Sequence, residues 1–215
     1  MVNKPMDLIR LGWCDFFAAS FAPYSDSGLG AARVGVGHRG GYGLYTADGE
    51  CFGQVSGRFR HGAAGPGDFP VVGDWVAIEA QPDGRTAIIH AVLPRRSKFS
   101  RAAPGDRTEE QVLAANMDDV WIVAALAADL NLRRIERYLA LAWQSGAQPG
   151  LVLTKADLCG DVATAAIQAE ASARGVSVWV VSSLTGDGVE VLRDRLRAGR
   201  TGVLLGPSGV GKSTL

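Results

Sequence analysis

The sequence predicts two folded parts in one chain, a small β-barrel followed by an α/β domain with a parallel sheet. Up to about residue 105, glycine is frequent and short segments alternate apolar and polar residues, as antiparallel strands do. Beyond that point, continuous apolar segments of strand length alternate with amphipathic helical segments, which is typical of parallel sheets with crossover helices. A length of 215 residues suits one or two such domains.

The barrel strands are expected from short alternating segments separated by turns. The turn signals are Ala47-Asp48-Gly49 and Pro82-Asp83-Gly84. Five short strands are expected within about 65 residues, at 33–38, 42–46, 51–58, 74–80 and 86–93. Ahead of them, the segment 13–21 predicts a short helix whose face of Phe16, Phe17 and Phe21 covers the barrel.

The second part begins after the basic connector 95–101. Strands buried on both faces are expected at 120–125, 150–154, 178–181 and 202–205. Asn131 is a candidate N-cap for a helix with an apolar face of Leu132, Ile135, Leu139 and Ala142. Further helices are expected at 162–174 and 189–196.

Composition excludes several classes of protein. Hydrophobic residues make up 47% and charged residues 20% of the chain, values that do not fit a disordered or collagen-like protein. The sequence has no apolar run of about 18 residues, and Asp7 and Arg10 interrupt any signal-peptide core. The three cysteines, Cys14, Cys51 and Cys159, are widely separated, as in a protein of a reducing compartment. We therefore expect a soluble, cytoplasmic protein without a membrane partner.

The charge is balanced overall but not along the chain. Lys and Arg number 22, as do Asp and Glu. Between residues 28 and 101, nine basic residues stand against six acidic ones, a difference of +3. Between 118 and 198 the numbers are eight and ten, a difference of −2. The mildly basic first part is compatible with a nucleic-acid partner.

A phosphate-binding loop is the strongest motif. Gly206-Pro207-Ser208-Gly209-Val210-Gly211-Lys212-Ser213 matches the pattern GxxxxGK[ST] and follows an apolar strand. Its glycines allow backbone N–H groups to surround a phosphate, and the next helix would direct its N-terminus at the same anion. In such loops the lysine bridges the β- and γ-phosphates and the serine hydroxyl ligates Mg²⁺, which assigns these roles to Lys212 and Ser213.

A second motif, Thr154-Lys155-Ala156-Asp157, indicates which base is bound. Guanine offers two adjacent donors, N1–H and N2–H₂, to a fixed carboxylate such as Asp157, whereas adenine offers an acceptor at N1. The aliphatic stem of Lys155 can cover the base plane. Ser182-Ser183-Leu184 follows the third strand, where a backbone N–H could meet guanine O6, although a serine-rich loop alone is nearly uninformative.

The order of these motifs is inverted, because ordinary GTPases carry the phosphate loop first. Both motifs follow parallel strands, so a circular permutation would keep the site while moving the termini. The sequence resembles the circularly permuted GTPases that depend on the small ribosomal subunit. The resemblance is carried by Gly12-Trp13, by Val72-Gly73-Asp74-Trp75-Val76, by Leu93-Pro94-Arg95-Arg96-Ser97, by Gln111 to Asn116, by Arg134 to Leu139 and by GPSGVGKSTL from Gly206.

The resemblance implies an organisation in three parts: a helical extension at 1–28, an OB-fold barrel at 29–103, and a permuted GTPase domain from 104 to 215. It implies GTP or GDP and Mg²⁺ as cofactors, with Ser213 as the metal ligand. The expected nucleotide-binding residues are Thr154, Lys155, Asp157, Leu158, Ser182, Ser183, Leu184, Gly206, Pro207, Ser208, Gly209, Val210, Gly211, Lys212, Ser213 and Thr214. Thr154 stands where Asn is commoner; its hydroxyl keeps one hydrogen bond to neighbouring loops, and a lower nucleotide affinity is expected.

The family's switch loops, its DxxG element and its zinc-binding segment would lie beyond Leu215. We therefore expect the chain to be the N-terminal part of a longer protein, with Zn²⁺ only in the later segment. We also expect that it does not hydrolyse GTP alone, because the groups that position water are in the switch loops.

The resemblance implies the small ribosomal subunit and its RNA as partners of a monomeric protein. OB barrels bind nucleic acid through a charged face with stacking aromatics, here Tyr42, Tyr45 and Phe59. The candidate RNA-binding residues are Arg33, Arg39, Arg58, Arg60, Arg95, Arg96, Lys98 and Arg101. Two alternatives stay open: a non-catalytic RNA-binding module with an α/β scaffold, and a phosphate-loop ATPase or nucleotide kinase.

Overall fold

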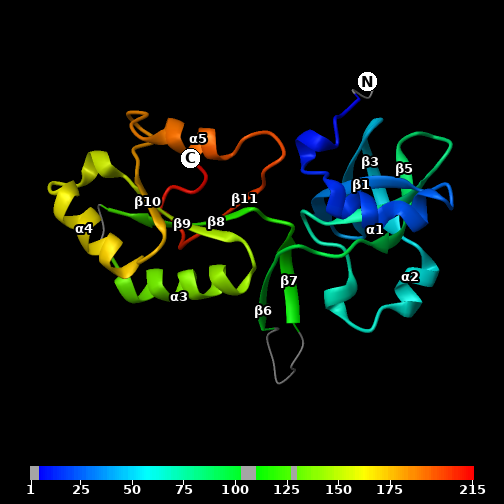
Figure 1. Ribbon diagram of the computed structural model, residues 1–215, viewed down its shortest axis with the longest axis horizontal. Coiled ribbons are helices and arrows are strands. Elements are labelled where there is room, and N and C mark those ends of the chain that lie inside the picture. The colour runs from blue at the N-terminus through cyan, green and yellow to red at the C-terminus, as the bar shows by residue number, and fades with distance from the viewer. Residues whose placement is uncertain (1–4, 103–109, 127–129) are drawn as a thin grey trace. The chain divides into compact units, whose positions relative to one another are not determined.

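The computed structural model describes residues 5–102, 110–126 and 130–215, without the side chains at positions 101, 102 and 110. The chain divides into two compact units, Met1–Asn116 and Met117–Leu215. The expected boundary between residues 103 and 104 lies outside the described residues. Figure 1 shows both units and labels their elements.

The first unit contains a closed five-stranded barrel, as predicted. Its strands pair in the order β1-β2-β3-β5-β4, antiparallel except for the parallel pair β3–β5. Their bounds are β1 Gly30–His38, β2 Gly41–Thr46, β3 Gly49–Val55, β4 Trp75–Ala80 and β5 Thr86–Val92. Alternate residues point inward, and Val34, Leu44, Val76, Ile78 and Ile89 form the core.

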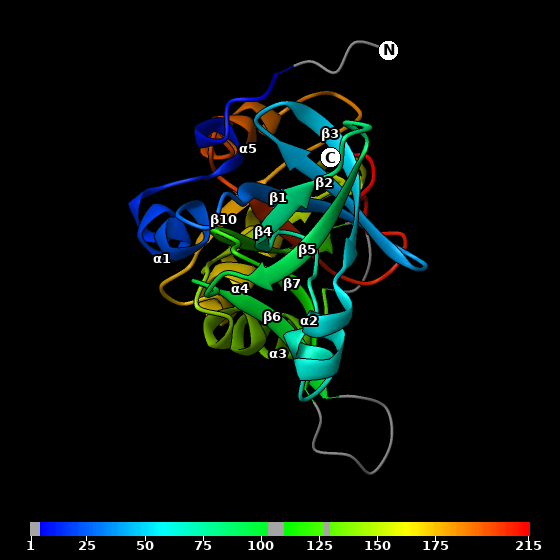
Figure 2. The ribbon, with the colours of Figure 1, turned by 90° about the vertical axis from the view of Figure 1, so that its right-hand side faces the viewer.

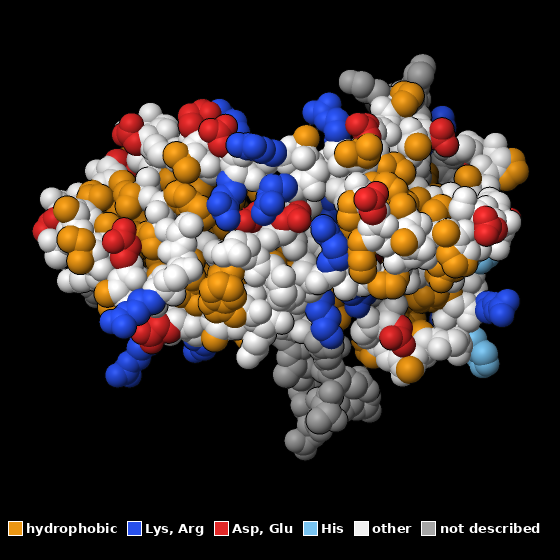
Figure 3. Space-filling view, viewed as in Figure 1, with side chains coloured by type: hydrophobic (Ala, Val, Ile, Leu, Met, Phe, Trp, Pro, Cys, Tyr) orange, Lys and Arg blue, Asp and Glu red, His pale blue; other side chains and the backbone are white. Residues whose placement is uncertain are grey.

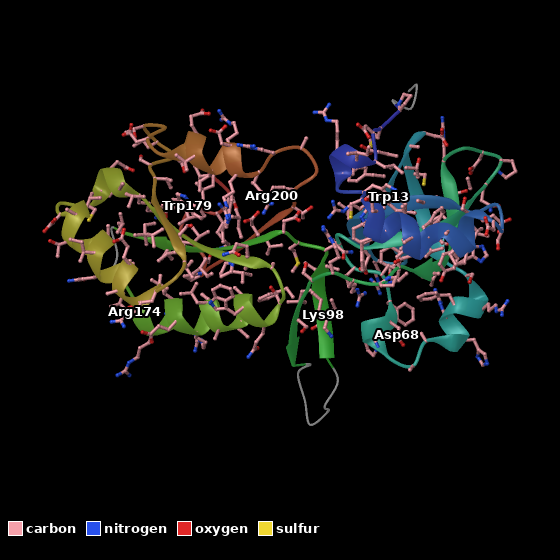
Figure 4. The ribbon with its side chains drawn as sticks, viewed as in Figure 1. Trp13, Asp68, Lys98, Arg174, Trp179 and Arg200 are labelled. Atoms are coloured by element: carbon pink, nitrogen blue, oxygen red, sulfur yellow. The ribbon has the colours of Figure 1, made fainter. Side chains whose placement is uncertain are left out.

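A helix covers one side of the barrel. It is α1, Asp15–Ser25, preceded by a 3₁₀ turn, η1, at Ile9–Leu11. Phe17 is fully buried with Trp75 and Leu93, and the ring of Trp13 lies 4.8 Å from that of Trp75, edge to face. Trp13 is labelled in Figure 4. Of the three phenylalanines expected to form one covering face, Phe16 remains 42% exposed. The predicted packing is therefore made by Phe17 and, in part, by Phe21.

Two local predictions for this unit were wrong: the end of the strand expected at 51–58, and the connector expected at 95–101, part of which is a strand. The strand expected at 51–58 ends at Val55, because the Ser56 hydroxyl accepts a hydrogen bond from the Phe59 N–H (3.0 Å) and caps a short helix, α2, Gly57–Gly62. A 3₁₀ turn, η2, follows at Pro66–Asp68. The basic connector includes a strand, β6 (Lys98–Ala102), which pairs antiparallel with β7 (Glu110–Ala115) in a separate two-stranded sheet.

The second unit has the predicted parallel sheet, in the order β10-β9-β8-β11. The strands are β8 Asp119–Ala125, β9 Gln148–Thr154, β10 Ser177–Val180 and β11 Gly202–Leu205. The helices are α3 Leu132–Gln144, α4 Val162–Ser172 and α5 Val189–Arg195, with a 3₁₀ turn, η3, at Ala156–Leu158. Helices α3 and α5 lie on opposite faces of the sheet (Figure 1). Asn131 caps α3 as predicted, accepting a hydrogen bond from the Arg134 N–H (2.9 Å).

Buried charges fix the amino-terminal end of this sheet. The Asp119 side chain, at the start of β8, is almost fully buried and accepts hydrogen bonds from Arg195 (3.3 Å) and Arg200 (2.6 Å). Arg195 also lies over the ring of Trp179, on the α5 side of the sheet (Figure 4). Among the described residues, none of the helices is both long and apolar enough to cross a membrane.

Candidate nucleotide-binding site

The sheet topology brings the three candidate loops to one edge. Strand β8 pairs in parallel with β11 on one side and with β9 on the other, and β9 pairs in parallel with β10. The carboxyl ends of parallel strands meet at the same edge of a sheet, where α/β proteins bind ligands. The loops that follow β11, β9 and β10 therefore meet there, although the phosphate loop comes last in the sequence.

The phosphate loop packs closely on the strand beside it. A Cβ at Gly206 would lie 2.4 Å from the carbonyl oxygen of Val123, so only glycine fits there. Gly209 and Gly211 have φ of 80° and 97°, values in the left-handed region that favours glycine. A Cβ at Gly209 would meet nothing within 4 Å, so the backbone there is open to a ligand.

The side chain of Lys212 lies across its own loop. Its ammonium donates to the carbonyl oxygens of Gly206 (2.9 Å) and Pro207 (2.7 Å). Within the described part of the chain, Lys212 forms no ion pair, so its positive charge is not neutralised by a carboxylate. A cation bonded only to carbonyl groups is a suitable partner for a phosphate.

Thr154 links the base-reading segment to the phosphate loop. Its buried hydroxyl donates to the carbonyl oxygen of Val210 (2.5 Å) and approaches that of Ala124 (3.2 Å). The hydrogen bond to a neighbouring loop that the sequence led us to expect of Thr154 is thus present. It ties the end of β9 to the loop after β11, across the end of β8.

Lys155 and Asp157, the other two residues of the base-reading motif, come directly after Thr154 at the end of β9. Lys155 has φ 58° and ψ 38°, a left-handed conformation that is uncommon for a residue other than glycine. Asp157 is exposed, and its Oδ1 accepts a hydrogen bond from the buried Ser182 hydroxyl (2.5 Å). The Ser182 oxygen itself accepts from the Thr185 N–H (3.2 Å), so the loop after β10 holds the carboxylate of the loop after β9.

Sequence reasoning assigned the segment Ser182–Leu184 only a backbone contact to the base, and it missed the Ser182–Asp157 bond. No local signal reveals such a bond, because it joins two loops. Leu158 and Leu184 are 65% and 82% exposed beside these polar groups, and Ser183 is half-buried. Exposed leucines at a polar edge leave apolar surface that a flat ligand could cover.

A cavity of about 270 Å³ adjoins the phosphate loop. Lys155, Pro207 and Ser208 line it from the loops, and Arg134 and Tyr138 line it from α3. Motif reasoning did not include the last two in the site, although they fall within the segment Arg134–Leu139. The geometry therefore places a cation and an aromatic ring of α3 next to the loop.

Comparison with known proteins identifies the family. The model of the RsgA GTPase family matches residues 92–215, more than half of the chain. The chain belongs to the RsgA GTPase family. It is 44% identical to the small ribosomal subunit biogenesis GTPase RsgA of Opitutus terrae, over 98% of this chain and 59% of that protein. It is 45% identical to the protein of the same name from Streptomyces coelicolor, over 97% of this chain and 56% of that protein.

This RsgA-family chain thus spans less than two thirds of the length of these relatives. Two solved structures share its fold at 22% identity. The crystal structure of YjeQ from Thermotoga maritima matches with a TM-score of 0.70, over 86% of this chain and 63% of that one. YloQ, described as a circularly permuted GTPase, matches with a TM-score of 0.63, over 86% and 62%. The fold expected from the sequence, an OB-like barrel followed by a permuted GTPase domain, is confirmed.

In this RsgA-family chain, two of the arginines predicted to bind RNA have guanidinium groups that bond within the barrel unit. Arg33 is 8% exposed; its guanidinium donates to the carbonyl oxygens of Leu11, Gly73 and Asn116 and lies over the ring of Trp75. Arg95 forms a bidentate ion pair with Asp74 (2.7 and 2.8 Å) and also donates to the carbonyl oxygens of Gly67 and Phe69.

The remaining candidates of the barrel unit differ in exposure and contacts. Arg39, Arg58 and Arg60 are exposed. Arg96 is exposed but lies over the ring of Phe17. Lys98 is exposed on β6, and the side chain of Arg101 lies outside the described residues. Of the proposed stacking residues, Tyr42, Tyr45 and Phe59 are all half-buried.

Proposed function

We propose that this chain binds guanine nucleotide and belongs to a GTPase that acts in maturation of the small ribosomal subunit, in the cytoplasm. The observation that carries the proposal is the pair of hydrogen bonds from Thr154 to Val210 and from Ser182 to Asp157. They join the phosphate loop, the base-reading segment and the third loop at one edge of the sheet. The names of the relatives supply the reaction and the ribosomal partner.

The carboxylate of Asp157 reads the base. Guanine N1–H and N2–H₂ donate to its two oxygens, while Ser182 keeps it oriented through one lone pair of Oδ1. Lys155 leaves β9 in a left-handed turn, which directs its aliphatic stem toward the base plane. Xanthine carries an additional oxo group in place of the amino group, so a carboxamide at position 157 would suit it better.

The phosphate loop binds the other end of the nucleotide. The N–H groups at Gly209 and Gly211 donate to the β-phosphate, and Lys212 moves from its loop carbonyls to the phosphate oxygens. Ser213 is exposed directly after Lys212, and its hydroxyl is a hard oxygen donor of the kind Mg²⁺ prefers. Ser213 would help to hold Mg²⁺, which would supply positive charge to stabilise the phosphate oxygens.

We also propose that the barrel unit binds ribosomal RNA. Three exposed arginines support this, Arg39 from the β1–β2 turn and Arg58 and Arg60 from α2. Phosphate contacts by such side chains give an affinity that falls with salt. The buried Arg33 and the half-buried Arg95, whose guanidinium groups bond within the barrel unit, are left out of this surface.

Nucleotide titration tests the proposal. GDP, XDP and ADP are titrated into the chain and into Asp157→Asn, with Asp161→Asn as the control. Asp161 is an exposed carboxylate that caps α4, a role asparagine fills equally well. We expect GDP to bind in preference to ADP, and Asp157→Asn to lose at least a hundredfold in GDP affinity while gaining XDP binding.

Equal affinity of wild type for ADP and GDP would favour the ATPase or kinase alternative. An Asp157→Asn variant that binds GDP as well as wild type does would remove the base-reading role. Salt-dependent RNA affinity in a chain that binds no nucleotide would favour the non-catalytic RNA-binding module.

A further inference from the structure

The cavity beside the phosphate loop has a basic lining. Its charged side chains are Arg134, from the first turn of α3, and Lys155, from the loop after β9. Within the described part of the chain, no aspartate or glutamate lines it. Asn131, Tyr138 and Ser208 add uncharged polar groups. Two cations without a carboxylate give the cavity a chemistry that suits an anion.

The rest of the lining is mostly apolar. The strand residues that reach the cavity all belong to the second half of β8, and they are joined by Ile135 of α3 and Val210 of the phosphate loop. Ile135 and Val210 are both buried. An anion held against such a wall is less screened by water than one on an open surface, so a neighbouring cation attracts it more strongly.

The position of Arg134 is fixed by the start of its helix. The side chain of Asn131 accepts a hydrogen bond from the Arg134 N–H (2.9 Å), which caps α3. Ile135 is only 2% exposed and packs in the core, so the rotation of the helix about its axis is set. Tyr138 follows Arg134 by four residues, on the same side of the helix, and also lines the cavity. Arg134 is thus held on the cavity side of α3.

The guanidinium of Arg134 makes no hydrogen bond or ion pair with any residue that the structure describes. The arginines after α4 differ in this respect, since Arg195 and Arg200 both donate to the buried Asp119. A guanidinium has five N–H donors in a planar fork that matches the oxygens of a phosphate. Arg134 therefore presents this fork to a cavity that adjoins a phosphate-binding loop.

The side chain of Lys212 indicates which phosphate lies nearest. Its ammonium bonds to the carbonyl oxygens of Gly206 and Pro207, at the beginning of the loop. In phosphate loops this lysine reaches the β- and γ-phosphates. Pro207 also lines the cavity that contains Arg134. The terminal phosphates and the cavity therefore meet at the same end of the loop.

The base-reading carboxylate lies toward the other side of the sheet. Asp157 is held by Ser182, which follows β10, and neither residue lines the cavity. In the sheet order β10-β9-β8-β11, the strand that contributes to the cavity is β8, next to the strand that leads into the phosphate loop. A nucleotide whose base is bound at Asp157 would thus extend its phosphates toward Arg134.

The cavity belongs to the α3 face of the sheet. Helices α3 and α5 lie on opposite sides of the sheet in Figure 2, as they do in Figure 1. On the surface around α3, both basic and acidic side chains protrude (Figure 3). The positive charge is therefore a property of the cavity lining and not of the whole α3 surface.

We propose that Arg134 contacts the terminal phosphate of GTP and is the residue of α3 by which this site distinguishes GTP from GDP. The inference rests on the proposed binding of guanine nucleotide. GDP lacks the terminal phosphate, so the guanidinium gains its charge-assisted hydrogen bonds only with the triphosphate. The contact is made by α3 and does not involve the residues that read the base.

The test measures the affinities of GDP and of GMP-PNP, a GTP analogue that resists hydrolysis, by isothermal titration with Mg²⁺ present. Wild type is compared with Arg134→Gln, which removes the charge, and with Arg134→Lys, which keeps the charge but not the fork. Arg133→Gln is the matched control, because Arg133 is the preceding exposed arginine of α3 and does not line the cavity. Circular dichroism during thermal unfolding checks that each variant folds.

We expect Arg134→Gln to lower the affinity for GMP-PNP by about tenfold or more, the loss of hydrogen bonds to a charged group, and to leave the affinity for GDP unchanged. Arg134→Lys should retain part of the preference for the triphosphate. Arg133→Gln should bind both nucleotides as wild type does. The ratio of the two affinities is decisive, since a purely structural role of Arg134 would lower both alike.

Three results would overturn the inference while leaving the proposed function intact. They are an unchanged GMP-PNP affinity in Arg134→Gln, an equal loss for both nucleotides, and the same change of ratio in Arg133→Gln. If wild type binds neither GDP nor GMP-PNP, the proposed nucleotide binding itself fails, and this inference fails with it.

Discussion

The barrel unit and the α/β unit differ in where they keep their buried charges. In the α/β unit, Asp119 and its two arginines lie at the amino-terminal end of β8, and the candidate site lies at the carboxyl ends of the strands. In the barrel unit, the buried Arg33 and the half-buried Arg95, which pairs with the buried Asp74, are interspersed along the chain with exposed arginines such as Arg39.

This difference teaches why one site can be found from sequence and the other cannot. At the end of a parallel strand, the loop alone supplies the chemistry, so a short motif identifies it. On a barrel surface, the role of an arginine depends on whether a carbonyl or carboxylate group from a distant segment accepts hydrogen bonds from its guanidinium. The arginines of the two roles look identical in the sequence.

Removing the buried carboxylate of the barrel has the largest expected effect on stability. Asp74 is fully buried; it accepts two hydrogen bonds from Arg95 and one from the Val71 N–H (2.8 Å). Asp74→Ala leaves the Arg95 guanidinium without its carboxylate, and we expect the barrel unit to lose about 3–5 kcal/mol of unfolding free energy. Urea unfolding measures it, with the exposed Asp48→Ala as control.

The same variant tests how separate the two units are. GDP affinity should be unchanged in Asp74→Ala at temperatures where the barrel is folded, since this ion pair and the nucleotide site belong to different units of the chain. A parallel loss of GDP affinity would show that the Asp74–Arg95 ion pair also supports the nucleotide site. The two units could then no longer be treated as separate.

The fold was largely predictable because its periodic signals are local. The alternating segments gave five barrel strands, and the buried runs gave the four parallel strands. Ser56 turned the end of one expected strand into a helix cap, which depends on a single hydroxyl. The β6–β7 pair was missed because its charged residues, such as Lys98, hide the alternation of a strand in a separate small sheet.

The candidate site was predictable only as far as its motifs extend. Glycine spacing and the Lys155–Asp157 pair located two loops, and the topology brought them together. The Ser182 bond to Asp157 and the position of Arg134 beside the phosphate loop depend on tertiary contacts between segments that no single motif contains.

A smaller effect is expected from the hydroxyl that connects two loops of the nucleotide site. Thr154→Val keeps the shape but leaves the buried carbonyl of Val210 without a donor, which costs about 1–3 kcal/mol. Because the phosphate loop loses its tie to β9, we expect GDP affinity to fall several-fold, while Thr154→Ser stays near wild type. Isothermal titration measures the affinity, and the exposed Thr164→Val is the control.

The outcome bears directly on the contrast between the units. If Thr154→Val lowers stability but leaves GDP affinity intact, the hydroxyl is a fold anchor placed inside the site. In the α/β unit, residues that stabilise the fold and residues that bind the ligand would then occur side by side, as they are proposed to do in the barrel unit.

The smallest expected effect compares one exposed aspartate in each unit. Asp83, in the β4–β5 turn, accepts from the N–H groups of Arg85 and Thr86 (both 2.9 Å), and these bonds lower its pKa from the ordinary 3.8. The Thr164 hydroxyl and N–H lower the pKa of Asp161, at the start of α4. A carboxylate whose pKa is lower in the folded state stabilises fully above its ordinary pKa and loses that contribution as pH falls through the folded value.

We therefore expect each unit to lose a little stability between pH 4 and the lower folded pKa of its own aspartate. Asp83→Asn should reduce the loss of stability at low pH in the barrel unit alone. Asp161→Asn should reduce it in the α/β unit alone. Carboxyl chemical shifts measured by NMR during an acid titration report both pKa values. A folded pKa at or above 3.8 for Asp83 would mean that the turn does not hold its carboxylate through those backbone N–H groups, and the two units would then differ in their local caps as well as in their buried anchors.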